Sequence, residues 1–289
     1  MTRSTFRSSA NRPAAGLAAL TVVSLLSGCS VMGSAAEAPA ASGSPSVVAS
    51  VPASSTPSPA SSTSAASAPH WAYTGDEAPD HWGELASEFS TCATGTAQSP
   101  IDLQSTAEPE DDDLVLAYSS VDEEAVDTGH TLQLNAQPGA GLTYGGVEYA
   151  LQQVHYHDPS EHTIDGRNAP IEFHFVNKDA EGNLLVIGVL GVQGEHNEAF
   201  EPLVDAATAG TMPAPTTVNV PAMMPSSLHH FAYEGSLTTP PCTEGVQWLV
   251  MDTPVQLGQD QIHTLETRYD NNNRPVQPLN DREVHVADQ

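Results

Sequence analysis

Basic residues are almost absent from this chain of 289 residues. Eight lysines and arginines stand against 36 aspartates and glutamates, which gives a formal net charge of −28. Beyond residue 29 only five basic residues remain against the same 36 acids, a net charge of about −31. Such a surface repels phosphate backbones, so nucleic-acid binding is excluded. It is strongly hydrated, and it also resembles adaptation to salt, which predicts poorer folding in low-salt buffer.

Long hydrophobic runs are also scarce. The longest, Ala14–Leu26, is too short to span a bilayer comfortably, and Arg3, Arg7 and Arg12 precede it. This pattern predicts an export signal over residues 1–29. It ends in Leu-Ser-Gly-Cys, which resembles the lipobox of bacterial lipoproteins. We therefore expect a lipid on Cys29 and a membrane-anchored protein on the cell surface or in the periplasm, the alternative being an ordinary signal peptide with an incidental cysteine.

Aromatic residues are missing from residues 30–69, and charged residues almost so. The segment consists mainly of Ala, Ser, Pro, Gly, Thr and Val, which cannot bury a core. It is interpreted as a disordered tether, with a span of roughly 35 Å if it behaves as a flexible coil. Residues 70–289 hold all three tryptophans and are long enough for one folded domain.

Cysteine is rare as well. If Cys29 carries lipid, only Cys92 and Cys242 remain. Two cysteines left in an exported domain indicate a disulfide. It would close a loop of about 150 residues and contribute at most about 5 kcal/mol to the free energy of unfolding. Two buried free thiols are the alternative.

Histidines, in contrast, occur in a pattern that predicts a metal site. Side chains alternate along a strand, so His155 and His157 project from one face of the segment Gln152–His157. His174 lies on a second strand-like segment, which we expect to be an antiparallel neighbour of the first. Three histidines leave the fourth tetrahedral position of a zinc ion open, as in catalytic sites. Taken alone, a His-x-His pair is more often a surface or core feature.

Two further side chains favour the metal interpretation. Gln153 and Glu172 each stand two residues before a proposed ligand, on the same face of its strand. Groups in such positions hold the second ring nitrogen of a metal-binding histidine.

The remaining pattern predicts a mainly antiparallel sheet with a few short surface helices. The expected strands are Asp113–Tyr118, Thr131–Asn135, Val147–His157, Ile171–Asn177, Leu184–Val192 and Val246–Asp252, and the expected helices are Asn197–Val204 and Asp260–Tyr269.

Several motifs, taken in order, resemble the alpha-class carbonic anhydrases. They are Gln98-Ser99-Pro100-Ile101, Gly129-His130, Gln153-Val154-His155-Tyr156-His157, Pro159-Ser160-Glu161-His162-Thr163, Gly235-Ser236-Leu237-Thr238-Thr239-Pro240-Pro241-Cys242 and Asn273-Arg274-Pro275. The resemblance runs from His70 to Asn280. It implies a mainly-β domain with a twisted sheet of about ten strands, and a disulfide between Cys92 and Cys242.

The resemblance also implies a reaction and the residues that perform it. Zinc (Zn²⁺) would be the cofactor, CO2 and bicarbonate the substrates, and a zinc-bound hydroxide the nucleophile; the pKa of about 7 for such a water is known from this family. Thr238 would act as gatekeeper, oriented by Glu161, and His130 as proton shuttle. The substrate pocket would consist of Val176, Val186, Leu237, Thr239, Val246 and Trp248. His162 is interpreted as a structural histidine.

The sequence departs from the family pattern at Asp158, Thr128 and Asn177, none of them a ligand or relay position. Two rival functions stay open. The same cleft could hydrolyse activated esters, and some relatives that have lost zinc ligands serve only as binding modules. All three histidines are present here, which favours catalysis.

Overall fold

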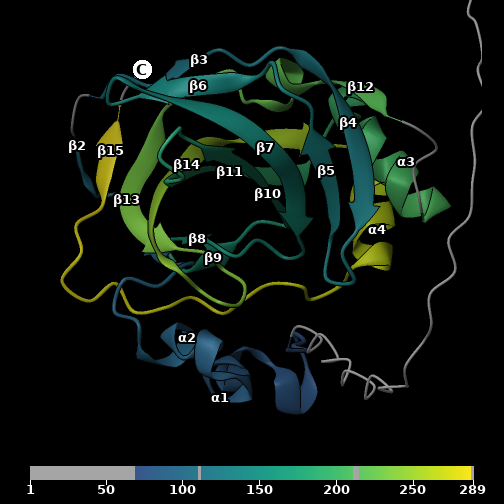
Figure 1. The fold of residues 1–289 in the computed structure, drawn as a ribbon. Coiled ribbons are helices and arrows are strands. Elements are labelled where there is room, and N and C mark those ends of the chain that lie inside the picture. Colours follow the sequence, from purple (N-terminus) through teal and green to yellow (C-terminus); the bar gives the residue numbers. More distant parts are fainter. Residues whose placement is uncertain (1–68, 110–111, 211–214, 288–289) are drawn as a thin grey trace, which may run out of the picture. The chain divides into compact units, whose positions relative to one another are not determined.

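A mixed, twisted sheet of twelve strands organises the described part of the chain in this computed structural model (Figure 1). The structure describes residues 69–109, 112–210 and 215–287. Ten of the strands follow one another as β12 (Thr216–Asn219), β4 (Ser120–Asp127), β5 (Leu132–Ala136), β7 (Val147–His157), β10 (Ile171–Lys178), β11 (Leu184–Gln193), β14 (Glu244–Leu257), β13 (His230–Ser236), β15 (His285–Ala287) and β2 (Glu108–Pro109). The remaining two are β6 (Gly141–Tyr144), which pairs with β7, and β3 (Val115–Leu116), which pairs with β6.

Most neighbouring strands are antiparallel, as predicted. The exceptions in this sheet are the parallel pairs β11–β14 and β15–β2. A second, three-stranded sheet consists of β1 (Asp102–Leu103), β8 (Thr163–Ile164) and β9 (Arg167–Asn168). The prediction of a mainly-β domain is confirmed. The sheet of about ten strands that the resemblance implied corresponds to the twelve strands found here, several of which are only two to four residues long.

The central strands β7, β10 and β11 match the predicted segments closely, since each is rich in β-branched and aromatic residues. Strand β4 was not predicted. Its sequence Ser-Val-Asp-Glu-Glu-Ala-Val-Asp is half acidic, a composition that is depleted in strands, yet it pairs along its length with β5 and β12. Val121 and Glu123 on it are buried and their neighbours exposed, so a partly acidic strand has one face in the core.

The helices are short, as predicted. The longer two are α3 (Glu201–Ala209) and α4 (Gln259–Arg268), which pack against each other beside the β4–β5 end of the sheet (Figure 1). The others are α1 (Trp82–Leu85), α2 (Thr91–Thr94) and the 3-10 turns η1 (Gly75–Glu77), η2 (Pro79–His81), η3 (Ser87–Phe89), η4 (Glu198–Phe200) and η5 (Val220–Met223). Among the described residues, no helix is long and apolar enough to cross a membrane. The predicted signal, Cys29 and nearly all of the tether fall in residues 1–68, outside the described residues.

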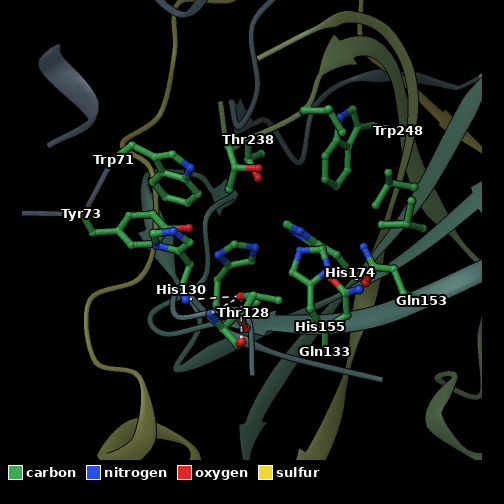
Figure 2. Close-up of a pocket in the computed structure, with 16 residues that line it drawn as sticks. Trp71, Tyr73, Thr128, His130, Gln133, Gln153, His155, His174, Thr238 and Trp248 are labelled. Atoms are coloured by element: carbon green, nitrogen blue, oxygen red, sulfur yellow. Dashed lines mark hydrogen bonds between the residues drawn. The ribbon is translucent and has the colours of Figure 1, made fainter. Parts of the chain in front are cut away.

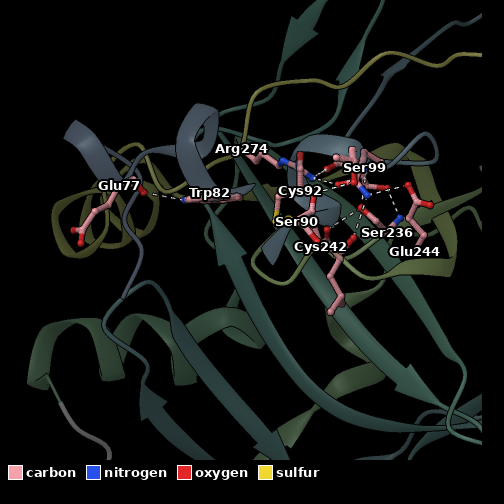
Figure 3. Close-up of a disulfide and its surroundings, with 12 residues drawn as sticks. Glu77, Trp82, Ser90, Cys92, Ser99, Ser236, Cys242, Glu244 and Arg274 are labelled. Carbon is pink, nitrogen blue, oxygen red and sulfur yellow. Dashed lines mark hydrogen bonds between the residues drawn. A yellow bond between two sulfur atoms is a disulfide. The ribbon is translucent and has the colours of Figure 1, made fainter. Parts of the chain in front are cut away.

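A disulfide joins Cys92 in α2 to Cys242 (Figure 3), 150 residues further along the chain. The buried side chain of Arg274 lies beside it and donates to the carbonyl oxygens of Cys92 (3.0 Å) and Ser99 (2.8 Å). Its guanidinium also lies 5.7 Å from the centre of the Trp82 ring, within reach of a cation–π contact. The cross-link and this arginine therefore hold the N-terminal segment against the loop after β13.

Strand β10 separates two layers of the core. Ile171, Phe173 and Phe175 face the large apolar cluster that includes residues of α3 and α4. The alternate side chains Glu172 and His174 point to the other face and are equally buried, with 0% and 1% exposure. A strand buried on both faces can carry polar groups only if these are paired or serve a ligand, so the second face marks the site.

Candidate metal centre and cleft

Three histidine rings converge on one point above strands β7 and β10. His155 and His157 lie on the same face of β7, and His174 lies directly opposite His155 in the antiparallel pairing of the two strands. The ring centres are 4.6–5.1 Å apart. One ligand nitrogen from each ring lies within 4.8 Å of the other two. The alternation and pairing predicted from the sequence thus bring the three imidazoles together.

The outer ring nitrogens have acceptors that fix which nitrogen carries hydrogen. His155 Nδ1 donates to Gln153 Oε1 (2.8 Å), and His174 Nε2 donates to Glu172 Oε1 (2.9 Å). His157 Nδ1 donates to the backbone oxygen of Asn272 (2.7 Å). An amide or carboxylate oxygen can only accept, so the lone pairs of His155 Nε2, His157 Nε2 and His174 Nδ1 remain free on the inner side.

Burial keeps these imidazoles neutral. Removal from water lowers the pKa of His157 from 6.5 to about 4, with the Asn272 carbonyl acting in the opposite direction. Desolvation, and then the two neighbouring histidines, hold the pKa of His155 well below its usual value. Desolvation likewise lowers the pKa of His174, although Glu172 opposes it. At neutral pH all three rings can therefore act as metal ligands.

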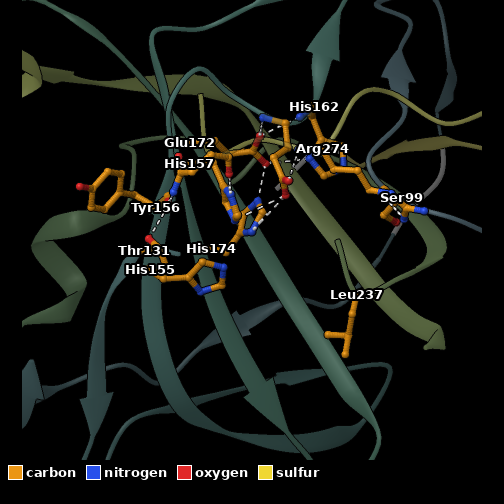
Figure 4. A network of polar contacts seen from close by, with 12 residues as sticks. Ser99, Thr131, His155, Tyr156, His157, His162, Glu172, His174, Leu237 and Arg274 are labelled. Atoms are coloured by element: carbon orange, nitrogen blue, oxygen red, sulfur yellow. Dashed lines mark hydrogen bonds and ion pairs between the residues drawn. The ribbon is translucent and has the colours of Figure 1, made fainter. Parts of the chain in front are cut away.

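Glu172 is the buried anion that supports the site from behind (Figure 4). Its Oε1 accepts from His162 Nδ1 (2.7 Å) as well as from His174. Its Oε2 accepts from the backbone N–H groups of Glu161 (2.9 Å) and His162 (2.8 Å). Burial alone would raise the pKa of Glu172, but these donors and the adjacent histidines hold it well below 4.5. The carboxylate thus stays charged and keeps His174 oriented.

Gly188 leaves the space that this carboxylate occupies. It lies opposite His174 in the pairing of β10 with β11. A Cβ atom at residue 188 would lie 2.9 Å from Glu172 Oε1, closer than real Cβ contacts allow. The glycine was not singled out in the sequence, because only the register of two strands reveals its neighbour.

Glu161 approaches the histidines from the loop after β7. Its Oε2 lies 3.5 Å from His157 Nε2 and 3.9 Å from His174 Nδ1, and its Oε1 accepts the backbone N–H of Arg274 (2.8 Å). Burial raises the pKa of Glu161 to about 7, while His174 and then the Thr238 hydroxyl act to lower it. The predicted partners Glu161 and Thr238 are therefore close enough to interact, although Oε2 has no hydrogen bond of ordinary geometry.

A cavity of about 230 Å³ opens over the histidines (Figure 2). Its walls consist of Trp71, Tyr73, Thr128, His130, Thr131, Gln133, Gln153, His155, His157, His174, Val176, Val186, Leu237, Thr238, Thr239 and Trp248. Val176, Val186, Leu237 and Trp248 make one side of it apolar. Of the pocket residues predicted from the resemblance, only Val246 is not in the lining; it lies in the buried cluster that contains Val186 and Trp248.

His130 lies in the same cavity, half-buried against Trp71 (Figure 2). The two rings are stacked, with centres 3.6 Å apart and planes inclined by 11°. Desolvation, and then the nearby His70, lower the pKa of His130 below 6.5. The backbone N–H of His130 donates to the Thr128 hydroxyl (3.3 Å), and this hydrogen bond closes the turn that carries His130.

The donor set fits a zinc ion. His157 Nε2 is a buried polar atom with no hydrogen bond partner, and it faces the other two ring nitrogens. An unpaired buried nitrogen is costly unless a ligand satisfies it. Three neutral imidazole nitrogens with one open side are typical of a catalytic zinc site.

Some residues that shape the site were not predicted for it. Asn272, 115 residues away in the chain, accepts from His157 through its backbone oxygen. Every residue has such an oxygen, so the sequence does not indicate which one binds the histidine. Gln133 and Thr131 line the cavity without a motif of their own. Trp71 and Tyr73 fall within the span of the resemblance, but no motif singled them out, and strand alternation does not predict that they lie beside His130.

Comparisons with known proteins agree on the family. The family model described as eukaryotic-type carbonic anhydrase matches residues 77–288. A carbonic anhydrase of Pectobacterium carotovorum is 41% identical over 217 residues, which cover 74% of this chain and 89% of the relative.

Solved structures give the same result. An alpha-carbonic anhydrase from Thermovibrio ammonificans, solved with the inhibitor sulfanilamide, matches with a TM-score of 0.72 and 35% identity over 76% of this chain and all of that one. Dioscorin, solved as a complex with ascorbate, matches with a TM-score of 0.70 and 28% identity over 76% of this chain and 98% of that one.

Proposed function

Because this chain belongs to the eukaryotic-type, or alpha, carbonic anhydrase family, we propose that it hydrates CO2 to bicarbonate and a proton with zinc held by His155, His157 and His174. The observation that carries this proposal is the convergence of three neutral, hydrogen-bonded imidazoles at the base of a cavity with one apolar wall. When bound, zinc supplies a Lewis acid that lowers the pKa of a water ligand enough to provide hydroxide at neutral pH.

Thr238 and Glu161 orient the nucleophile. The ionised form of Glu161 can only accept, so its interaction with Thr238 directs the Thr238 hydroxyl hydrogen toward it. The lone pairs of Thr238 would then be available to accept a hydrogen bond from the nucleophile that bound zinc would supply, and Thr238 would thereby orient that nucleophile toward the substrate. The backbone N–H of Arg274 donates to the carboxylate of Glu161, and the backbone N–H of His162 donates to that of Glu172. These two buried donors keep the carboxylates in place.

The apolar wall binds the substrate. Carbon dioxide has no charge, so a pocket for it gains from removing apolar surface from water. Val176, Val186 and Leu237 line the cavity next to the histidines, and Trp248 lies 4.8 Å from the ring of His174, centre to centre. Bicarbonate, the charged product, is disfavoured by the same wall, which promotes its release.

His130 carries the released proton to solvent. Its imidazole lines the same cavity, and its pKa lies below 6.5, so the neutral form that accepts a proton predominates at neutral pH. Stacking on Trp71 holds the ring on the cavity wall. A half-buried histidine that is neutral at neutral pH can accept a proton and pass it on to solvent.

The proposal is tested by stopped-flow CO2 hydration on zinc-loaded protein, with zinc counted per chain. The variant His155→Ala is expected to lose both zinc and hydration. His81→Ala removes an exposed histidine outside the cavity and serves as the matched control. Stoichiometric zinc without hydration in the unaltered protein would contradict the enzyme proposal and favour a binding role.

For the remainder of the chain, we propose export and lipid attachment at Cys29, with anchoring to a membrane. The support is the sequence Leu26-Ser27-Gly28-Cys29 after an apolar run with three preceding arginines. Cells that express the full chain are expected to incorporate labelled fatty acid into it, and Cys29→Ala to abolish the label. Equal labelling of the two proteins would refute the anchor.

A further inference from the structure

Asn272 is a buried asparagine whose side-chain amide bonds to backbone groups of two separate segments. Its exposure is 2%. Nδ2 donates to the carbonyl oxygens of His130 (3.0 Å) and Tyr156 (3.1 Å), and Oδ1 accepts the N–H of Asp158 (2.8 Å). A carbonyl oxygen can only accept and an N–H can only donate, so these partners fix the orientation of the amide. One side chain thus connects the turn that carries His130 to the end of β7.

The main chain of Asn272 binds the same end of β7. Its oxygen accepts from His157 Nδ1 (2.7 Å), and its N–H donates to the carbonyl oxygen of Asp158 (3.1 Å). Together with the side chain, Asn272 therefore bonds to three consecutive residues, and the middle one is a proposed zinc ligand. A shift of Asn272 would move the acceptor that orients His157.

These bonds begin where the pairing of β5 with β7 stops. Towards the turn, the last paired residues are Gln133 and His155. Beyond them the buried carbonyl oxygen of Tyr156 accepts from two side chains, Asn272 Nδ2 and Thr131 Oγ1 (2.7 Å). A buried backbone group at the end of a strand pairing needs such partners. Side chains thus extend the connection between the two strands as far as the turn that joins β4 to β5.

The segment that leads to Asn272 is anchored to the same turn. The side chains of Arg268 and Tyr269, at the end of α4, both donate to the carboxylate of Asp127, the last residue of β4. That carboxylate also accepts the backbone N–H of Gly129 (2.9 Å). The chain at the end of α4 therefore holds the turn at its first residues through Asp127 and at its later residues through Asn272.

We propose that Asn272 is a positioning residue for proton transfer, because its amide fixes the turn of His130 relative to the end of β7 that carries the metal-binding histidines. This inference rests on the proposed function, in which His130 takes the proton out of the cavity. Proton transfer requires a donor and an acceptor within hydrogen-bond reach, so its rate depends on where the accepting ring lies. Trp71 stacks on that ring, and Asn272 holds the backbone behind it.

Loss of the amide should affect one kinetic constant more than the other. In Asn272→Ala the backbone oxygen remains, but the three side-chain hydrogen bonds are lost. Proton transfer to solvent follows the release of bicarbonate, so it contributes to kcat and not to kcat/KM for CO2. At saturating zinc and low buffer concentration, kcat should fall about tenfold, while kcat/KM should change by no more than about twofold.

The test is stopped-flow CO2 hydration by zinc-loaded Asn272→Ala and by the unaltered protein, with and without added imidazole. Imidazole in solution accepts the proton in place of His130 and should restore kcat to within about twofold of the unaltered value. It would not repair a fold that is merely loosened. Asn273→Ala changes the neighbouring asparagine, which does not line the cavity, and should behave like the unaltered chain. An unchanged kcat without imidazole, or a loss that imidazole does not restore, would overturn the proposal.

Hydrogen exchange provides a measurement that does not depend on turnover. The backbone N–H groups of His130 and Thr131 both donate to the Thr128 hydroxyl. They should exchange about tenfold faster in Asn272→Ala, because loss of a buried hydrogen bond makes opening of the turn easier. Should this variant not fold, Thr131→Val removes the other side-chain bond to the Tyr156 oxygen and should change kcat and exchange in the same directions.

The two measurements separate this proposal from the proposed function. Absence of hydration in the unaltered zinc-loaded protein would contradict the proposed function, and with it the role in proton transfer. Hydration by the unaltered protein, together with unchanged kcat and unchanged exchange in Asn272→Ala, would refute only the role of Asn272.

Discussion

At the scale of single residues, the site depends on side chains that hold other side chains. Gln153, Glu172 and the carbonyl of Asn272 each accept from one of the three converging histidines, and so leave the opposite nitrogen of that ring free. Replacing a ligand tests whether the metal binds at this position. Replacing a supporting residue tests whether the orientation of the ligands matters, and it separates an effect on metal binding from an effect on turnover.

Thr238→Ala should lower turnover while leaving zinc bound. Its hydroxyl interacts with Glu161 and lines the cavity, but it is not among the residues whose atoms could hold the metal. Loss of an orienting hydrogen bond at a reacting group costs roughly 10²-fold in rate. Stopped-flow kinetics and zinc analysis measure the two effects, and Thr238→Ser should recover much of the rate. Full activity in the alanine variant would remove Thr238 from the mechanism.

Gly188→Ala should weaken zinc binding without touching the metal. The new methyl group would lie 2.9 Å from Glu172 Oε1 and displace the carboxylate that orients His174. Changes in such supporting groups typically cost about 10–100-fold in metal affinity. Competition with a zinc-selective chelator measures the affinity, and circular dichroism verifies the fold. An affinity equal to that of the unaltered protein would show that Glu172 can move without loss.

At the scale of elements, the strands that the sequence predicted most accurately are those whose residues follow one consistent strand pattern. Val147–His157 has the predicted bounds, and β10 alternates as predicted between apolar and site-facing side chains. The opposed positions of His155 and His174 follow from two adjacent antiparallel strands. Strand β4 escaped prediction because acidic residues are unusual in strands. Pairing with β5 and β12 overrides that local preference.

Strand β4 also carries a pH-dependent cost. Glu123 is fully buried, neither carboxyl oxygen has a hydrogen bond, and desolvation raises its pKa from 4.5 to about 8. The folded chain therefore holds a proton there that the unfolded chain releases. Its contribution to stability is complete below about pH 4.5 and is lost as the pH rises to about 8.

Glu123→Gln should remove this pH dependence. Relative to the variant, the unaltered protein should lose roughly 3 kcal/mol of unfolding free energy between pH 5 and pH 9, after allowance for local relaxation. Denaturant unfolding at several pH values measures the difference. Glu124→Gln, next to it but exposed, is the control. Parallel pH profiles for the unaltered protein and Glu123→Gln would show that Glu123 finds a partner or water in solution.

At the scale of the whole molecule, the features that bear on stability are the disulfide cross-link and the net charge. The disulfide closes a loop of about 150 residues, which in the chain-entropy model stabilises the fold by at most about 5 kcal/mol. The sequence supported this pair by count and by resemblance. It could not reveal that Arg274 is buried beside the bond and that its backbone N–H donates to the carboxylate of Glu161.

The net charge of −28 predicts a stability that depends on salt. Self-repulsion among acidic groups opposes the compact state, and salt screens it. The midpoint of thermal unfolding should therefore rise between low-salt buffer and molar NaCl. The same measurement on a chain in which exposed acids are replaced by their amides should show a smaller rise. Indifference of the unaltered protein to salt would exclude adaptation to a saline habitat.

The central claim is that one zinc ion at His155, His157 and His174 makes this chain a CO2 hydratase. The most direct test is to remove the metal with a chelator and titrate zinc back while stopped-flow proton release is recorded. We predict that the hydration rate rises in proportion to added zinc and reaches its plateau at one equivalent per chain. A rate that stays at the uncatalysed level after one equivalent has bound would contradict the claim.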